Sequence, residues 1–173
     1  MVMDADVPVV ESGGQADFFY GQTPSMLYPV AKVDRVLHDG DRVRLGDSVL
    51  VAHLTPGHTK GCTTWTIAVT DSGKNYDVVI VGSPNVNPGY KLVNNAAYPQ
   101  IASDYEKTFA VLRSLHCDVF LGAHGSYYDM ETKYARRTGT TNRFIDRRGY
   151  ETYVNERERA FRTELTRQQG GTR

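Results

Sequence analysis

The sequence predicts an α+β fold in which a β-sheet is covered by helices, and three observations support this. Segments of strand character separated by turn residues fill positions 36–81. Apolar residues then recur at helical spacing from position 101, and a charged segment at 150–169 carries a narrow apolar stripe. Strands followed by helices in a chain of 173 residues predict one domain, residues 1–173, built from a sheet and helix layers.

Little regular structure is expected before position 36. Residues 7–10 read Val-Pro-Val-Val, and we expect a short strand there. Residues 11–35 are rich in Gly, Pro, Ser and aromatic side chains, which is typical of a long loop or lid.

The central part of the chain has a clear strand pattern. Residues 42–45 alternate, Gly46-Asp47 makes a turn, and 48–54 is a strand. Two further strands are expected at 62–70 and 76–81, separated by the turn sequence Asp-Ser-Gly-Lys-Asn. The segment 82–90 has two prolines and two glycines, so it is expected to be a structured loop.

Helices dominate the remaining sequence. Ser103 followed by Glu106 has the form of a capping box, with Ser103 at the N-cap. The apolar face of this helix is expected to comprise Ile101, Tyr105, Phe109, Leu112 and Leu115. Residues 117–121 then predict a short buried strand, and 150–169 predict a C-terminal helix.

Composition excludes several classes of function. The formal net charge is zero, which argues against nucleic acid or an anionic membrane as a partner. No apolar stretch approaches the ~18 residues of a membrane span. Cys62 and Cys117 permit one disulfide, although two buried thiols are the simpler expectation. The first residues have neither the basic nor the apolar region of an export signal.

Two histidines have the same sequence setting. His58 and His124 each follow an apolar strand and a turn of small residues. Loops at strand ends often carry functional residues, and imidazole is the commonest side-chain ligand of transition metals. The pair could converge on a metal ion. Because the two residues are 66 positions apart, spacing alone favours the alternative that they are loop histidines bonded to backbone.

Other candidates favour structural roles. His53 lies inside a strand, whereas His38 and His116 are expected at the surface or at a helix end. The Tyr127-Tyr128 pair is expected to be a surface feature. The sequence has no Gly-x-Ser-x-Gly nucleophile motif and no Gly-x-Gly-x-x-Gly phosphate loop.

Four segments resemble one family. They are DADVPVVESGG (4–14), HLTPGHTKGCTTWTI (53–67), VGSPNVNPGYKL (81–92) and YPQIASDYEKTFAVLRSLHCDVFLGAH (98–124). Together they resemble the C-terminal portion of class B β-lactamases of the third subclass, over about residues 4–167. The resemblance implies an αββα metallo-β-lactamase sandwich, here mainly its C-terminal sheet and helices. It also implies hydrolysis of penicillins, cephalosporins and carbapenems with two zinc ions, and therefore antibiotic resistance.

The resemblance assigns roles to particular residues. His58 matches a ligand of the first zinc, and His124 matches a ligand of the second. Ser83 stands where relatives such as thioesterases and lactonases carry a metal-bridging aspartate, and it matches the residue that supports the site by hydrogen bonds. Asn85 and Tyr90 lie in the loop that meets substrate, where Tyr90 would polarise the lactam carbonyl.

The chain also departs from the family pattern. The main metal motif, His-x-His-x-Asp-His, is absent, and the resemblance implies that it lies upstream of Met1. The family often pairs a cysteine at the Cys117 position with one near Tyr150, and that disulfide cannot form here. We therefore expect weak zinc binding and no activity from this polypeptide alone, with the missing N-terminal portion as a partner.

Two alternatives to a zinc β-lactamase stay open. One is a non-catalytic truncated product. The other is a different hydrolase of the same superfamily, a thioesterase or lactonase, which Ser83 disfavours. The resemblance implies a periplasmic location, although this chain shows no export signal.

Overall fold

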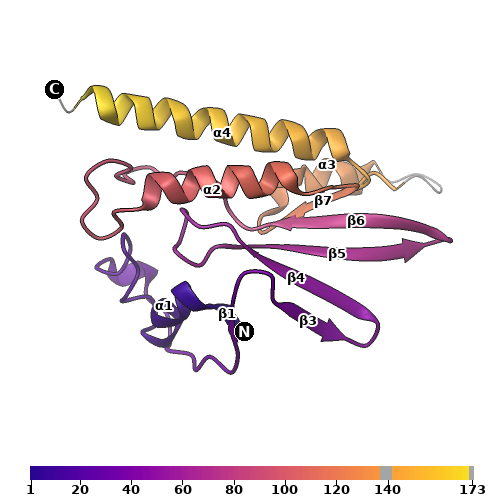
Figure 1. The fold of residues 1–173 in the computed structure, drawn as a ribbon, viewed down its shortest axis with the longest axis horizontal. Coiled ribbons are helices and arrows are strands. Elements are labelled where there is room, and N and C mark those ends of the chain that lie inside the picture. Colours follow the sequence, from indigo (N-terminus) through magenta and orange to yellow (C-terminus); the bar gives the residue numbers. More distant parts are fainter. Residues whose placement is uncertain (137–141, 172–173) are drawn as a thin grey trace.

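The computed structural model describes residues 1–136 and 142–171. Its main feature is a five-stranded sheet in the order β3-β4-β5-β6-β7. Two helices lie along one face of this sheet, and the N-terminal segment lies at its other side (Figure 1). The strands are β3 (Arg42–Leu45), β4 (Ser48–Leu54), β5 (Thr63–Asp71), β6 (Lys74–Val81) and β7 (Val119–Gly122).

Strand direction determines which loops meet. Neighbouring strands are antiparallel from β3 to β6, whereas β6 and β7 are parallel. A parallel pair needs a crossover connection, and helix α2 (Ile101–Ser114) lies within it. Consequently β4, β6 and β7 all run in the same direction, so the loops that follow them emerge at the same edge of the sheet.

The β5–β6 hairpin is closed by a tight turn. Asp71 pairs with Lys74, which leaves Ser72 and Gly73 as the two loop residues. Both have positive φ, 51° and 79° respectively. This is the backbone of a type I′ turn, whose twist matches that of the flanking strands. The turn sets the register of the hairpin.

The larger core lies between the sheet and the helices α2 and α4 (Arg147–Gly170). Phe161 of α4 is fully buried, with its ring stacked 5.2 Å from that of Tyr105 and 5.7 Å from that of Phe109. Val79 and Val81 contribute the sheet side of this core. Burial of large apolar side chains of this kind stabilises by about 1.5–3 kcal/mol each.

A smaller core lies on the opposite face of the sheet. Strand β1 (Val2–Met3) pairs in parallel with β2 (Val36–Leu37), and Met3 and Leu37 pack against Ala52 of β4. Ala52 pairs with Trp65, and Trp65 pairs with Ile80, one residue out of phase with Val79 and Val81. Because side chains alternate along a strand, the two cores are on opposite faces.

The remaining short elements are η1 (Asp4–Asp6), α1 (Val7–Glu11), η2 (Pro24–Met26), η3 (Gly125–Tyr128) and α3 (Met130–Ala135). The structure confirms the predicted α+β class. Strands β3 and β4 span the predicted residues, while β5, β6 and β7 differ from prediction by one or two residues at their ends.

Two local predictions are wrong. Residues 7–10 form the helix α1 instead of a strand, and Pro8 lies in its first turn, where a missing N–H costs nothing. Helix α2 begins before Ser103, with Gln100 at the N-cap and no side-chain cap. The Ser103 hydroxyl donates to the Gln100 carbonyl instead, at 2.8 Å.

Both cysteines are free and buried, as expected. Burial raises the pKa of the Cys62 thiol to about 11 and that of Cys117 to about 12. Neither thiol is therefore ionised near neutral pH, which disfavours redox chemistry. Tyr150, near the position of the family's second cysteine, donates its hydroxyl to the Leu112 carbonyl at 2.7 Å.

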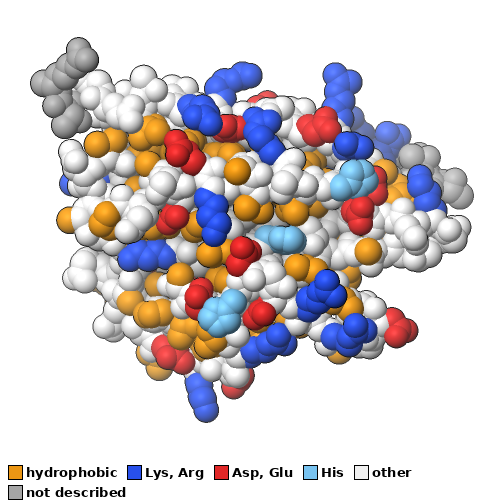
Figure 2. All heavy atoms as spheres, viewed as in Figure 1, with side chains coloured by type: hydrophobic (Ala, Val, Ile, Leu, Met, Phe, Trp, Pro, Cys, Tyr) orange, Lys and Arg blue, Asp and Glu red, His pale blue; other side chains and the backbone are white. Residues whose placement is uncertain are grey.

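The surface agrees with a neutral chain. Figure 2 shows acidic and basic side chains interspersed over one face, with no large area of a single charge. No helix in the described residues has the length and apolar character needed to cross a membrane.

Candidate metal centre at one edge of the sheet

Three loops that follow β4, β6 and β7 form the candidate site. The first, 55–61, carries His58; the second, 82–90, carries Ser83 and Asn85; the third begins at Ala123 and carries His124. All three leave the sheet at one edge because their strands run in one direction. The topology thereby brings the loops of His58 and His124, which are 66 positions apart in sequence, to the same edge of the sheet.

The loop around His58 is rigid. Thr55 donates its backbone N–H to the Cys62 carbonyl at 2.8 Å, closing the base of the loop. Thr108 of α2 donates its hydroxyl to the Pro56 carbonyl at 2.6 Å. Gly57 has φ +127°, and a Cβ there would lie 2.8 Å from the Tyr105 ring. Only glycine fits this position.

A half-buried carboxylate fixes the other half of the loop. Asp6 accepts hydrogen bonds from the Thr59 hydroxyl at 2.5 Å and the Gly61 N–H at 2.7 Å. A Cβ on Gly61 would come within 2.7 Å of the Asp6 carboxyl carbon. Burial raises the pKa of Asp6, and the two hydrogen bonds oppose that shift only in part. The N-terminal segment thereby positions the loop of His58.

The ring of His58 has a defined orientation. Its Nδ1 lies 3.0 Å from the Asn85 carbonyl, which also accepts the Tyr105 hydroxyl at 2.7 Å. A carbonyl can only accept, so Nδ1 carries the proton when the ring is neutral. Nε2 then keeps its lone pair. This is the tautomer of a histidine that is ready to bind a metal.

Ser83 is held at the start of the second loop. It is 7% exposed, and its N–H donates to the Cys62 sulfur at 3.1 Å. Its hydroxyl lies 3.1 Å from the Tyr127 hydroxyl. The Asn85 side-chain amide donates to the same hydroxyl at 2.9 Å. Tyr127 therefore joins the second loop to the third.

Tyr127 corrects the expectation that Tyr127-Tyr128 is a surface pair. The residue is half-buried in η3, and the edge of its ring faces His124 at 5.0 Å between ring centroids. His124 itself is exposed. Sequence reasoning missed Tyr127, although its place three residues after His124 was an available signal.

Tyr90 is buried behind the His58 loop, so its side chain is not exposed in the candidate site. It is 3% exposed and donates its hydroxyl to the His58 carbonyl at 3.0 Å. Phe18 and Phe19 pack edge-on to its ring at 5.0 and 4.9 Å. Burial raises the pKa of Tyr90 far above its usual value. The phenol is a neutral donor that holds the His58 backbone.

The predicted site residues thus share one contact network. His58 bonds to Asn85, Asn85 and Ser83 bond to Tyr127, and Tyr127 contacts His124. The metal-ligand set is incomplete, however. Within the part of the chain that the structure describes, neither histidine belongs to a group of three close His, Cys, Asp or Glu ligands. A zinc site takes three or four such protein ligands.

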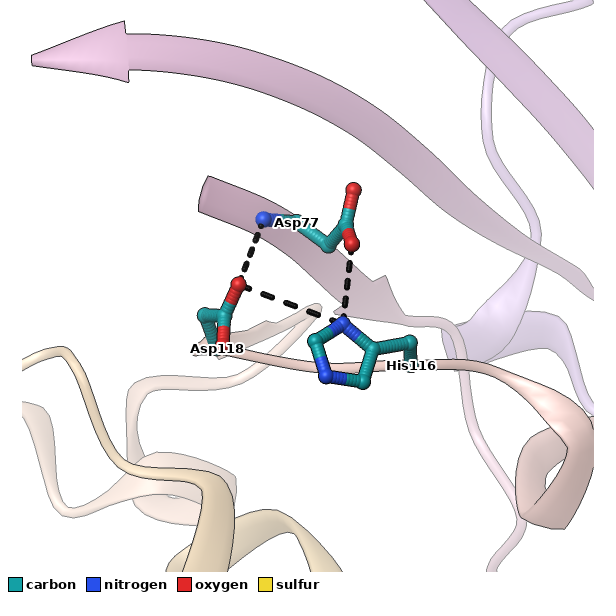
Figure 3. Close-up of side chains that lie close together, drawn as sticks. All are labelled: Asp77, His116 and Asp118. Atoms are coloured by element: carbon teal, nitrogen blue, oxygen red, sulfur yellow. Dashed lines mark hydrogen bonds and ion pairs between the residues drawn. The ribbon is translucent and has the colours of Figure 1, made fainter. Parts of the chain in front are cut away.

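One group of three such side chains lies elsewhere (Figure 3). The ligand atoms of Asp77, His116 and Asp118 lie within 4.8 Å of one another, so they could hold a metal ion. They already have protein partners. His116 Nδ1 is 2.8 Å from Asp77, and Asp118 accepts the Asp77 N–H at 3.0 Å. Arg147 approaches the other ring nitrogen at 3.4 Å, which suits an ion-pair cluster better than a cation.

Comparison with known proteins identifies the family. No family model matches the chain. Among solved structures, the native FEZ-1 metallo-β-lactamase from Legionella gormanii is 51% identical, with a TM-score of 0.96 over 98% of this chain and 65% of that one. BJP-1, a subclass B3 enzyme of Bradyrhizobium japonicum, is 34% identical with a TM-score of 0.89, over 99% of this chain and 64% of that one.

A third solved structure is the class B3 di-zinc metallo-β-lactamase LRA-12 from an Alaskan soil metagenome. It is 30% identical with a TM-score of 0.86, over 94% of this chain and 62% of that one. The fold is therefore that of a metallo-β-lactamase. Within that class the chain belongs to subclass B3, as its sequence motifs predicted. It spans about 65% of the length of the relatives that it matches.

Proposed function

We propose that the complete enzyme to which this chain corresponds is a zinc-dependent β-lactamase acting on penicillins, cephalosporins and carbapenems. The carrying observation is the network at the edge of the sheet, where Ser83 and Asn85 join the loops of His58 and His124 through Tyr127. The relatives are metallo-β-lactamases, which favours this reaction over thioester or lactone hydrolysis.

Each residue has a proposed role. His58 would bind the first zinc through Nε2, with its ring oriented by the Asn85 carbonyl. His124 would bind the second zinc. Ser83 would support the site through its hydroxyl, and Asn85 would contact substrate. The burial of Tyr90 and its bond to the His58 carbonyl support a positioning role for this residue over the polarisation of the lactam carbonyl.

The ligands in this chain do not complete either zinc site. Zinc with three protein ligands and an open position lowers the pKa of bound water to about 7, and here each ion would find one imidazole. We therefore propose that this polypeptide alone is inactive and binds zinc weakly. The portion that bears His-x-His-x-Asp-His would be its partner, and the family resemblance favours a periplasmic enzyme.

The test uses a chimera. The part of FEZ-1 that this chain does not span is fused to residues 1–173, and hydrolysis of nitrocefin is measured with added zinc. We expect turnover by the chimera and none by the chain alone. His58→Ala and His124→Ala should each lower kcat/KM by at least about 100-fold, on the order of the effect of removing catalytic electrostatics. The matched control His38→Ala removes an exposed histidine and should change nothing.

Two results would overturn the proposal. One is a folded, zinc-loaded chimera without turnover, which would contradict the assigned chemistry. The other is enzyme-like turnover by residues 1–173 alone, which would contradict the claim that the ligand set is incomplete.

A further inference from the structure

A second polar feature lies behind the candidate site, between the loop after β6, the turn η3 and helix α4. In the described residues, three buried side-chain polar atoms lack a hydrogen-bond partner: Asn85 Oδ1, Tyr153 OH and Arg157 Nε. All three residues line the same pocket of 670 Å³. Such atoms are rare in folded proteins, so their convergence on one cavity requires an explanation.

Burial without a partner is costly, at about 1–3 kcal/mol for each group. Tyr153 is only 8% exposed, so bulk water does not satisfy its hydroxyl. Tyr153 and Arg157 are four residues apart on α4, which places them on the same face of the helix. The guanidinium carbon of Arg157 lies 5.8 Å from the centre of the Tyr153 ring. A ligand or ordered water in the pocket would satisfy both groups.

The charges that line the pocket favour an anion. Arg157 has no ion pair among the described residues, and Arg148 adds a second guanidinium. Of the two acids that line the pocket, Asp146 is paired with Lys133 at 2.6 Å and also accepts the Gly149 N–H at 2.8 Å. Glu156, exposed on α4, is the remaining acid. The local balance is therefore positive.

The Asn85 side chain can supply a third donor. Its amide is placed with Nδ2 toward the Tyr127 hydroxyl. The oxygen and nitrogen of an amide are interchangeable in shape, and a hydroxyl can donate as well as accept. If the amide turns over, Tyr127 donates to Oδ1, and the NH₂ group points toward the position now occupied by the orphan oxygen. Asn85, Tyr153 and Arg157 then present only donors to the pocket.

We propose that this pocket binds a small oxyanion, a carboxylate or a phosphate group, through Arg157 Nε, the Tyr153 hydroxyl and the Asn85 amide. A neighbouring pocket of 620 Å³ shares Asn85 and Arg157 and leaves room for the body of a larger molecule. Binding here involves no metal and no bond breaking. The pocket shares Asn85 with the candidate metal site, but oxyanion binding can be measured without zinc and without β-lactam turnover.

The test follows the Nε–H signal of Arg157 in residues 1–173 by ¹H–¹⁵N NMR. The signal is identified by its absence in Arg157→Lys. Inorganic phosphate and acetate are added in separate titrations at constant ionic strength, with chloride as the reference anion. We expect a saturable shift with at least one oxyanion and none with chloride, and the two titrations distinguish phosphate from carboxylate recognition.

Matched variants sharpen the result. Arg157→Ala should weaken oxyanion binding roughly 10- to 100-fold, as the loss of a hydrogen bond to a charged group does. Arg159→Ala removes the same charge from the same helix outside the pocket and should leave binding unchanged. Tyr153→Phe should weaken binding with little effect on thermal stability, because its hydroxyl has no hydrogen-bond partner within the described residues.

The proposal is overturned if the shift does not saturate, if chloride produces it equally, or if Arg157→Ala and Arg159→Ala bind alike. Each of these outcomes would show that Arg157 does not belong to a specific oxyanion site in this pocket. Failure of the nitrocefin chimera would leave this conclusion unaffected, since the two experiments measure different groups and different ligands.

Discussion

The parallel strands β6 and β7 carry a histidine cluster near each end, and the two clusters are built differently. Just before β7 begins, His116 and Asp118 form an ion-pair cluster with Asp77 of β6, and the side chains of His116 and Asp77 are exposed, at 51% and 55%. At the C-terminal ends of the two strands Ser83 is buried and is bonded to a half-buried tyrosine. Direct contacts between charged side chains thus hold the first cluster together. Hydrogen bonds from the backbone and from neutral side chains hold the second.

The difference supports the proposal that the C-terminal ends of these strands carry the functional site. Exposed ion pairs contribute little and need no special backbone. The edge where these strands end instead uses a glycine with positive φ, a half-buried carboxylate and a shared tyrosine hydroxyl to hold its loops, and the Asn85 carbonyl orients the His58 ring. Such support is expected around a metal ligand. Four substitutions, from the largest expected effect to the smallest, test this contrast.

Gly57→Ala should have the largest effect. The added Cβ would lie 2.8 Å from the Tyr105 ring in a backbone with φ +127°. Strain and overpacking together should cost about 3 kcal/mol or more in free energy of unfolding, measured by urea denaturation. Gly46→Ala, with φ +57° and open space around it, is the control and should cost about 1 kcal/mol. Equal losses would refute the close packing assigned to the loop.

Tyr127→Phe should lower the free energy of unfolding by about 1–3 kcal/mol, because Ser83 and Asn85 lose their shared partner. The control is Tyr128→Phe, next in sequence, whose hydroxyl makes no hydrogen bond within residues 1–136 and 142–171. Chemical denaturation compares the two variants. A neutral Tyr127→Phe would show that the hydroxyl does not join the two loops.

Asp6→Asn should change the pH dependence of stability. Burial raises the pKa of Asp6 above its ordinary 3.8. The native state then keeps the proton in a range where the unfolded chain has lost it, so this group's stabilising contribution falls as pH rises from about 3.8 through the folded-state pKa. The unsubstituted chain should therefore lose stability relative to the Asp6→Asn variant over that window. Parallel denaturation curves at pH 4 and pH 7 measure it, and a relative gain with rising pH would contradict the sign.

His116→Ala should have the smallest effect, about 0–1 kcal/mol, because its ion pairs are exposed. The loss should shrink further in high salt, where exposed charges are screened. Unfolding at low and high ionic strength measures both quantities. A loss comparable to that of Tyr127→Phe would remove the contrast between the two ends of the strands.

Local patterns predicted the fold well, and long-range contacts explain what they missed. Alternation identified β3, and the small residues after apolar runs identified the loops of His58 and His124. Pro8 was assigned to a strand, although it suits the first turn of a helix equally well. Ser103 had the cap signature, but the turn that begins α2 starts three residues earlier and uses Ser103 internally.

The supporting residues of the site could not be predicted in the same way. Tyr127 meets Ser83 and Asn85 across separations of 44 and 42 positions. These contacts form only because β6 and β7 are parallel neighbours, and no local sequence pattern predicts that pairing. Likewise, the sequence predicts Tyr153 only as part of the apolar stripe of a charged helix, and the pocket that Tyr153 and Arg157 share with Asn85 depends on how α4 packs.

The central claim is that His58 and His124 face one incomplete metal site. A double-mutant cycle for zinc affinity tests it most directly, measured by calorimetry in a His116→Ala background that removes the exposed cluster's imidazole. The account predicts weak binding that His58→Ala and His124→Ala each lower and that the double variant abolishes, because each imidazole would hold one ion. Unchanged binding in the double variant, or a zinc pair retained against a chelator, would contradict it.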